Sequence, residues 1–386
     1  MSESADWKLH GGLIGRQGSR RSLNTPALVL DLEALEANIA AMAKLAAGAG
    51  VRLRPHAKTH KSVDIARRQI AAGAVGQCCA KLGEAEALAE GGIGGLLITS
   101  PVVAAPAVER LVALNARADG LMATADHPDA VDALARAAET AGQTLSLVVD
   151  VDPGLRRTGV ASAADAVALA RRIQSHAALR FSGVQFYCGS QQHIESFVER
   201  RAAIEERTGY LRSVLAALDE AGAPAALVTG GGTGTHRIDM ELGVFTELQV
   251  GSYVFMDRQY LDCDLTGADA EAGAPFRTSL VVDARVVSAN SAGLVTVDAG
   301  FKAFATEAGA PPILAGAPDG ARYAFMGDEH GAVIGPERTT RLALDSLVTF
   351  GVPHCDPTVN LYDSYHVVKD DTLVDIWPVS ARGRSR

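Results

Sequence analysis

The sequence predicts a (β/α)8 barrel of the TIM type followed by an antiparallel β-domain. From residue 25 to about Asp257, short apolar β-type runs alternate with Ala-rich amphipathic stretches, which is the pattern of successive βα units with parallel strands. After Asp257 the apolar residues alternate with a period of two between polar turns, as in antiparallel strands. We therefore expect a barrel at residues 25–257 and a β-domain at residues 258–386, with residues 1–24 packed on the β-domain.

Nine runs in the first part read as strands. They lie at residues 25–32, 51–57, 75–82, 95–101, 120–126, 145–151, 181–187, 226–232 and 247–256. Nine strands in this length suit an eight-stranded barrel with one extra strand at an end better than an open Rossmann sheet. In the second part, we expect strands within residues 276–300, 343–353 and 365–379.

Composition narrows the class of protein. The net charge is -9 and the basic residues are scattered, which argues against a nucleic-acid surface and leaves small molecules or proteins as partners. Five cysteines without CxxC spacing fit a reducing compartment. The polar N-terminus and the lack of a long apolar run predict no membrane segment, so we expect a cytoplasmic protein.

Lys58 is the first candidate for a catalytic residue, because active sites of parallel barrels lie at the carboxyl ends of the strands. It follows the run at 51–57 and alternates in phase with Arg54 and His56, so the three side chains are expected to face the barrel mouth. Burial lowers the pKa of a lysine and makes it nucleophilic toward carbonyls. Lys61, by contrast, is interpreted as a solvated residue that opens the following helix.

A glycine-rich segment follows the run at 226–232. Glycines there let backbone N–H groups approach a phosphate, although a tight turn is the simpler alternative. The segment consists of Gly230, Gly231, Gly232, Thr233 and Gly234. Other polar strand-end residues are Lys81, Asp150, Asp152, Arg156, Arg157, Tyr187, Ser190, His193, Gly251, Ser252 and Tyr253. For Arg157, Tyr187 and His193, packing, salt bridging or capping are the alternatives.

The β-domain contains a candidate metal site in HCDPT, where His354, Cys355 and Asp356 are consecutive. In extended backbone His354 and Asp356 share a face and Cys355 points away. One histidine with one carboxylate suits Mn²⁺, Mg²⁺ or Zn²⁺ with open positions for a substrate. A structural turn built on Asp356 and Pro357 is the alternative.

Several motifs together resemble a known family. These motifs are RPHAKTHK, GVQFYCGSQQH, GGGTG with ELQVGSY, DAGFK, DEHG and HCDPTVN. In this order they resemble the metal-activated pyridoxal-phosphate enzymes of the D-threonine aldolase and D-serine dehydratase family, which share an alanine-racemase-like fold. The resemblance runs from about Thr25 to Arg386.

The resemblance implies a role for each matching residue. Lys58 matches the lysine that forms a Schiff base with pyridoxal phosphate, and His193 matches a candidate base near the substrate hydroxyl. His354 and Asp356 match the two protein ligands of the metal. The cofactor-binding positions would be Arg157, Tyr187, Gly230, Gly231, Gly232, Thr233, Gly234, Gly251, Ser252 and Tyr253.

Within that family, dehydratases resemble His-x-Cys with zinc, whereas aldolases resemble His-x-Asp with manganese or magnesium. Because Asp356 stands two residues after His354, the resemblance favours an aldolase that cleaves D-threonine or 3-hydroxy-D-aspartate to glycine and acetaldehyde or glyoxylate. Cys355 keeps a D-serine or 3-hydroxyaspartate dehydratase open. An amino-acid racemase and a non-catalytic pyridoxal-phosphate carrier are further alternatives. The family also implies a homodimer in which the β-domain of one subunit lies near the barrel of the other.

Overall fold

The computed structural model describes residues 4–267, 274–336 and 342–386. These residues form two compact units. The barrel unit contains residues 40–251, 263–267 and 383–386, and the sheet unit contains residues 4–39, 252–262, 274–336 and 342–382. The long helix α2 (Leu32–Ala49) belongs to both units.

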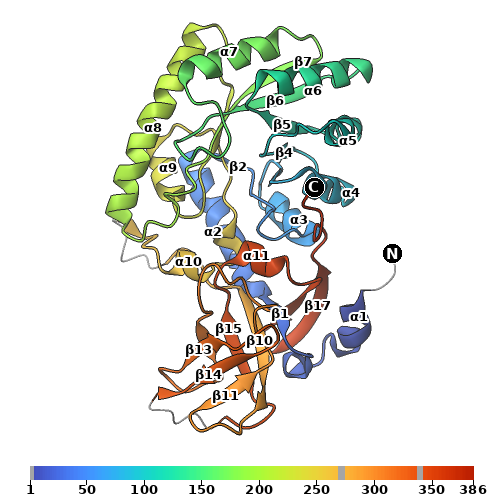
Figure 1. Ribbon diagram of the computed structural model, residues 1–386, viewed down its shortest axis with the longest axis vertical. Coiled ribbons are helices and arrows are strands. Elements are labelled where there is room, and N and C mark those ends of the chain that lie inside the picture. Colours follow the sequence, from blue (N-terminus) through green and yellow to red (C-terminus); the bar gives the residue numbers. More distant parts are fainter. Residues whose placement is uncertain (1–3, 268–273, 337–341) are drawn as a thin grey trace. The chain divides into compact units, whose positions relative to one another are not determined.

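The barrel unit holds eight parallel strands in the order β2-β9-β8-β7-β6-β5-β4-β3 (Figure 1). A parallel bridge between His56 and Cys78 joins the two end strands, so the sheet closes and the predicted barrel is confirmed. The strands are β2 (Arg52–Leu53), β3 (Gln77–Cys79), β4 (Leu96–Ile98), β5 (Met122–Ala125), β6 (Leu145–Asp150), β7 (Leu179–Phe186), β8 (Leu227–Gly230) and β9 (Glu247–Leu248).

Helices follow the barrel strands in the expected alternation. They are α3 (Val63–Ala71), α4 (Leu82–Glu90), α5 (Ala105–Asn115), α6 (Pro128–Thr140), α7 (Ala163–Gln174), α8 (Phe197–Glu220) and α9 (His236–Leu242). Serines cap two of them, because the hydroxyls of Ser162 and Ser196 accept from the N–H groups of Asp165 and Glu199. Strand β6 is buried along its whole length, as expected of a strand covered on both faces.

The sheet unit is built on nine mostly antiparallel strands. They are β1 (Ala27–Asp31), β10 (Leu280–Ser288), β11 (Leu294–Val297), β12 (Ile313–Ala315), β13 (Arg322–Phe325), β14 (Gly331–Ile334), β15 (Leu347–Gly351), β16 (Ser364–Lys369) and β17 (Thr372–Pro378). Short helices α1 (Ala5–His10), α10 (Arg258–Leu261) and α11 (Cys355–Val359) complete the unit. Strands β12, β13 and β14, each three or four residues long, were not predicted.

Two strand predictions need correction. The run at 25–32 forms β1, but β1 pairs with β10 and β16 in the sheet unit instead of joining the barrel. The run at 247–256 is a strand only at Glu247–Leu248. Beyond it the backbone turns into a short 3-10 helix at Ser252–Val254, where the Ser252 carbonyl accepts from the N–H groups of Phe255 and Met256.

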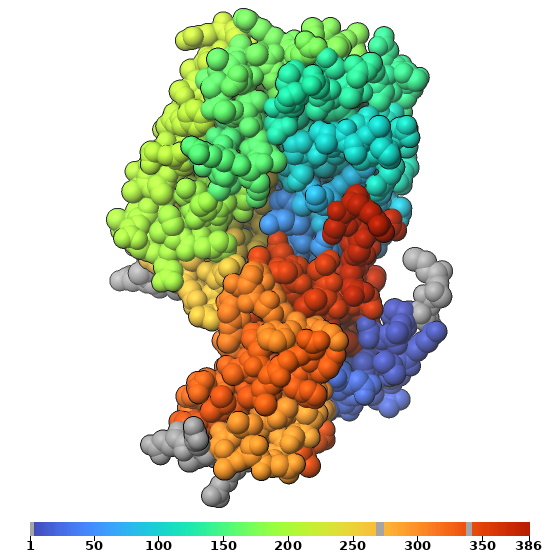
Figure 2. Space-filling model, in the orientation of Figure 1, coloured from blue at the N-terminus to red at the C-terminus, as the bar shows by residue number. Residues whose placement is uncertain are grey.

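Both ends of the chain are held by hydrogen bonds. In the sheet unit, the N–H of Gly15 donates to the Leu373 carbonyl at 2.8 Å, and Arg20 pairs with the Asp283 carboxylate at 2.8 Å. In the barrel unit, the N–H of Gly83 donates to the Arg386 carbonyl at 3.0 Å, and Figure 2 shows the dark-red C-terminus against the cyan residues of this region. No helix in the described ranges is long and apolar enough to cross a membrane.

Candidate functional site

Lys58 lies in the turn that follows β2 at the carboxyl end of the barrel, and its side chain is half-buried. Its backbone N–H lies 3.4 Å from Nδ1 of His56. His56 is buried, and its Nε2 lies 3.1 Å from the Thr99 hydroxyl at the end of β4. The turn therefore places Lys58 at the barrel rim, where the sequence predicts it.

Lys61 is not the solvated residue that we expected. It is buried, and its Nζ donates to Oε1 of Glu84 in α4 at 2.6 Å. The second oxygen of Glu84 accepts from the N–H groups of Ala80 and Lys81. Because this ion pair is formed across two βα units, the spacing in the sequence gave no sign of it.

A buried polar network links several strands of the barrel, and most of its members were missed from the sequence. Arg54 makes a buried pair with Glu247 at 2.7 Å and 3.1 Å. Gln185 donates to Asp150 at 2.9 Å, and Gln249 donates to Gln185 at 3.2 Å. Burial raises the pKa of Asp150 although bonds from Gln185 and Thr158 lower it. Such a satisfied network fixes the orientation of these side chains inside the barrel.

The residues after β6 and β7 form a second part of the rim. Arg157 is exposed, and its guanidinium carbon lies 5.8 Å from the centroid of the Tyr187 ring. His193 is exposed on the loop after β7, directly after the buried Gln192. Since these loops leave neighbouring parallel strands, Arg157, Tyr187 and His193 lie on the same edge of the barrel as Lys58.

The glycine-rich segment forms a buried loop between β8 and α9. Two of its N–H groups donate to protein groups: that of Gly232 to the Thr235 hydroxyl at 3.2 Å, and that of Gly234 to Oε1 of Gln192 at 3.0 Å. Gly231 has a φ of +69°, which favours glycine. The sequence suggested that the backbone N–H groups of this loop are open to a phosphate. At least two of them instead donate to groups of the protein.

Gly251 follows β9 beside the Lys58 turn. A Cβ on Gly251 would lie only 2.7 Å from the Thr59 hydroxyl, and this buried hydroxyl has no hydrogen-bond partner among the described residues. A cradle without Cβ atoms and an unsatisfied hydroxyl beside Lys58 fit the phosphate end of a cofactor. Ser252 and Tyr253 belong to the sheet unit, where the Tyr253 ring packs 5.7 Å from that of Phe276.

The proposed metal ligands lie in the sheet unit. His354 is the N-cap of α11, so Asp356 stands in the first helical turn and not in the extended backbone that we assumed. Both side chains are half-buried, whereas Cys355 is fully buried. Burial raises the pKa of the Cys355 thiol well above its usual range, and its Sγ donates to Oδ1 of Asp356 at 3.6 Å.

Glu307 and Asp257 support this loop, and neither was expected. Nδ1 of His354 lies 2.7 Å from Oε1 of Glu307, which leaves Nε2 for a metal; ligating histidines commonly hold their other nitrogen on a carboxylate in this way. The buried Asp257 accepts from the Cys355 N–H at 2.8 Å. The donor set therefore fits a divalent ion with open coordination positions.

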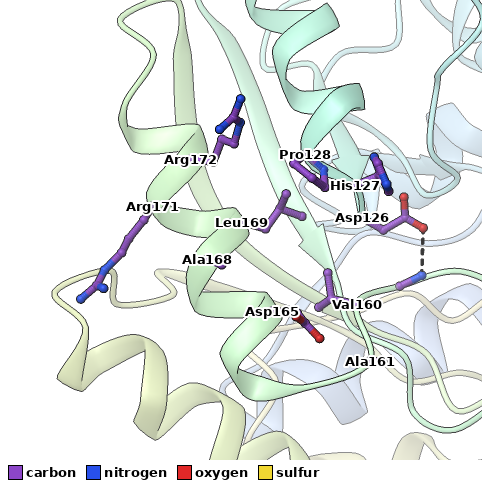
Figure 3. Close-up of a pocket in the computed structure, with 11 residues that line it drawn as sticks. Asp126, His127, Pro128, Val160, Ala161, Asp165, Ala168, Leu169, Arg171 and Arg172 are labelled. Carbon is purple, nitrogen blue, oxygen red and sulfur yellow. Dashed lines mark hydrogen bonds between the residues drawn. The ribbon is translucent and has the colours of Figure 1, made fainter.

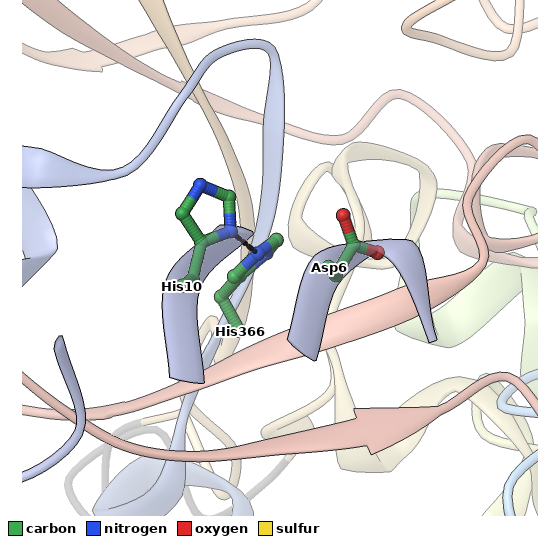
Figure 4. Close-up of side chains that lie close together, drawn as sticks. All are labelled: Asp6, His10 and His366. Atoms are coloured by element: carbon green, nitrogen blue, oxygen red, sulfur yellow. Dashed lines mark hydrogen bonds between the residues drawn. The ribbon is translucent and has the colours of Figure 1, made fainter. Parts of the chain in front are cut away.

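Asp6, His10 and His366 form another cluster of side chains that could bind a metal (Figure 4), with one ligand atom of each within 4.8 Å of the others. The Asn24 N–H donates to Nε2 of His10 at 3.0 Å, which leaves the His10 proton on Nδ1. Nδ1 lies 2.9 Å from Nε2 of His366, whose Nδ1 is 3.3 Å from the Leu28 carbonyl. The facing nitrogens are thus used in a hydrogen bond, so we retain His354 and Asp356 as the candidate ligands.

A cavity of about 700 Å³ lies between α6 and α7 (Figure 3). Asp126 lines it and accepts from the Gly159 N–H at 3.0 Å, and Arg172 lines it and pairs with Asp132. None of the predicted site residues lines this cavity.

Comparisons with known proteins identify the class that these features define. Residues 30–259 match the domain family described as alanine racemase, N-terminal domain, and residues 279–368 match a putative serine dehydratase domain. The protein therefore has the alanine-racemase-like fold, and this family implies pyridoxal phosphate as the cofactor.

The full-length relatives narrow the class. The chain is 39% identical to the D-threonine aldolase of Arthrobacter sp. over 94% of both chains. It is 35% identical to the 3-hydroxy-D-aspartate aldolase of Paracoccus denitrificans (strain Pd 1222) over 94% of this chain and 93% of that one. Identity to the D-threo-3-hydroxyaspartate dehydratase of Delftia sp. (strain HT23) is 32% over 76% of each chain.

A solved structure agrees with this result. The D-threonine aldolase of Filomicrobium marinum superposes with a TM-score of 0.89 and 36% identity, covering 95% of this chain and 97% of that one. The chain belongs to the D-threonine aldolase and 3-hydroxy-D-aspartate aldolase family and is a pyridoxal-phosphate-dependent lyase.

Proposed function

We propose that the protein is a divalent-metal-dependent aldolase that cleaves a β-hydroxy-D-amino acid, of the D-threonine or 3-hydroxy-D-aspartate type, to glycine and acetaldehyde or glyoxylate. The observation that carries the proposal is identity to two aldolases over 94% of the chain. The aspartate two residues after His354 agrees with it, since the family's aldolases resemble His-x-Asp.

Most of the residues that would bind the cofactor belong to the barrel unit. Lys58 would bond its aldehyde carbon, while Arg157 and Tyr187 would line it. Gly251, Ser252 and Tyr253 would complete the phosphate cradle with the glycine-rich loop. When bound, pyridoxal phosphate supplies an electron sink for the pair left at the substrate Cα.

His354 and Asp356 would hold the metal, Mn²⁺ or Mg²⁺ with Zn²⁺ as the alternative, which lowers the pKa of a bound hydroxyl. His193 would take the proton from the β-hydroxyl oxygen. The bond between Cα and Cβ then breaks, its electron pair stays at Cα, and the hydroxyl carbon becomes the aldehyde. Because the two groups of residues lie in different units, their action on one substrate is inferred from the family.

A dehydratase is the second candidate. It would use the same residues to remove the Cα proton and expel the β-hydroxyl, and Cys355 is the feature that favours it. The complete burial of the Cys355 side chain counts against it. A racemase or a non-catalytic carrier would leave the serine dehydratase domain at residues 279–368 unexplained.

We also propose that the protein is a homodimer and that it lies in the cytoplasm.

The cofactor role is tested by Lys58→Ala. A lysine-bound cofactor absorbs visible light, so the variant should lose this absorption band and nearly all activity, whereas the neighbouring Lys61, held by Glu84, should not be required for the band. Retention of the band in Lys58→Ala would mean that the cofactor is bound elsewhere.

The metal role is tested by His354→Ala and Asp356→Ala. Both variants should keep the visible band but lose stimulation by Mn²⁺, and chelation should reduce wild-type turnover to their level. Cys355→Ala is the matched control, which should keep metal stimulation because the thiol is fully buried. Wild-type activity after chelation and in both variants would contradict the metal role.

A further inference from the structure

Gln192 stands at the centre of the hydrogen bonds that hold the glycine-rich loop. Its side chain is completely buried. Oε1 accepts from the Gly234 N–H at 3.0 Å, and Nε2 donates to the Thr235 hydroxyl at 3.0 Å and to the Cys188 carbonyl at 3.2 Å. Both protons of the amide are used, which fixes its orientation.

The glycines of the loop make room for this residue. A Cβ on Gly232 would lie 2.4 Å from Oε1 of Gln192, and a Cβ on Gly234 would lie 2.0 Å from the Gln192 carbonyl oxygen. The second contact is with backbone, which cannot move aside cheaply. The absence of a Cβ atom at these two glycines therefore allows Gln192 to pack against the loop.

The bonds continue from Gln192 into α9. The Thr235 hydroxyl, which accepts from Gln192 and from the Gly232 N–H, donates to Oδ2 of Asp239 at 2.5 Å. His236 adds a contact within the loop, since its Nδ1 lies 2.7 Å from the Thr233 carbonyl. Thr233 is thus held between Gly232 and Gly234, whose N–H groups are both occupied.

Gln192 also belongs to the loop that carries His193. The guanidinium of the buried Arg200 donates to the carbonyls of Ile194 and Glu195, so the loop is anchored on the other side of His193 as well. One buried amide therefore ties the loop after β8 to the loop after β7.

We propose that Gln192 is a positioning residue for the cofactor: it holds the glycine-rich loop in the conformation that binds the phosphate of pyridoxal phosphate. The inference rests on the proposed function, which assigns the phosphate to this loop. Loss of the amide would leave the buried Gly234 N–H without its acceptor. Because an unsatisfied buried donor costs free energy, the loop would then favour another conformation in which this N–H finds a partner.

The test measures how fast the holoenzyme releases its cofactor. Gln192→Met keeps the volume but removes every hydrogen bond of the amide, and Gln192→Asn keeps the amide but shortens its reach. Upon dilution into cofactor-free buffer, the visible band of Gln192→Met should decay roughly tenfold to a hundredfold faster than that of the wild type, as expected for the loss of one or two buried hydrogen bonds. Gln191→Ala, at the neighbouring half-buried glutamine, should release the cofactor at the wild-type rate.

The melting temperature of the cofactor-free protein separates positioning from general stability. Wild-type release by Gln192→Met would overturn the proposal, as would faster release accompanied by a large fall in this melting temperature. If Gln192→Met does not fold, Gln192→Asn decides by the same criterion. Two outcomes distinguish this inference from the proposed function. If Lys58→Ala loses the visible band but the Gln192 variants release the cofactor at the wild-type rate, this inference alone is wrong. If Lys58→Ala keeps the band, the proposed function is wrong.

Discussion

Asp239 shows how burial sets the charge state of one residue beside the glycine-rich loop. Its carboxyl is buried, and desolvation raises its pKa to about 7 although bonds from Thr235 and Gly232 lower it. In the unfolded chain an aspartate has a pKa near 3.9. Between these two values the folded protein therefore binds more protons at this site than the unfolded chain.

Asp239→Asn should change the pH dependence of stability in a defined direction. A raised pKa in the folded state contributes stability that is fully present below about pH 4 and is lost as the pH rises through about 7. We expect the free energy of unfolding of the wild type to fall between pH 5 and pH 8 relative to that of the variant. Urea unfolding at both values measures this, and an equal change in the two proteins would contradict the assigned pKa.

Local motifs predicted where the candidate residues of the barrel rim lie but not what surrounds them. Lys58 lies just after a barrel strand, at its carboxyl end, as predicted. This position could be predicted because the alternation of side chains along a strand and the end of the strand both depend on neighbouring residues alone. Gln192 and Glu307 were missed because their partners lie about 40 and 47 residues away in the sequence. The only local hint of a role for Gln192 was its position directly before the candidate residue His193.

At the scale of elements, the sequence predicted the type of each long strand better than its partners. Strand β1 has the apolar pattern of a barrel strand, yet it pairs with β10 and β16. Pattern alone specifies which residues are buried, and both sheets bury the same residue types. The closing bridge between His56 and Cys78 likewise depends on contacts between separate βα units.

The buried pair between Lys61 and Glu84 should stabilise the link between the Lys58 turn and α4. Because Glu84→Ala leaves the Lys61 charge buried without its carboxylate, we expect it to lower the free energy of unfolding by about 3–5 kcal/mol. Replacing both residues together, by Lys61→Met and Glu84→Gln, should cost less than Glu84→Ala. Denaturant unfolding measures both effects, and a loss below 1 kcal/mol in Glu84→Ala would indicate a solvated pair.

At the scale of the whole molecule, the N-terminal segment is held to the C-terminal strands of its own unit. Gly15 and Arg20 bond to residues of β17 and its turn, and His10 bonds to His366 in β16. Burial lowers the pKa of both histidines, with Asp6 and, for His366, Asp283 acting in the opposite direction. Residues 4–24 are therefore part of the folded sheet unit.

Acidification should weaken this attachment. The unfolded chain protonates these histidines near pH 6.5, whereas the folded protein resists protonation, so stability should fall as the pH drops below that value. His366→Gln should show a smaller loss of stability between pH 7 and pH 5 than the wild type, together with lower stability at pH 7. Equal pH dependence in the two proteins would contradict the assignment of neutral, hydrogen-bonded rings.

The central claim concerns the bond that the protein breaks, and product identification tests it most directly. The purified enzyme with pyridoxal phosphate is incubated with D-threonine, D-serine or 3-hydroxy-D-aspartate, with and without Mn²⁺, and the products are identified by mass spectrometry. We predict glycine with acetaldehyde or glyoxylate, formed faster with Mn²⁺. Ammonia with a keto acid, and no glycine, would contradict the aldolase assignment and identify a dehydratase.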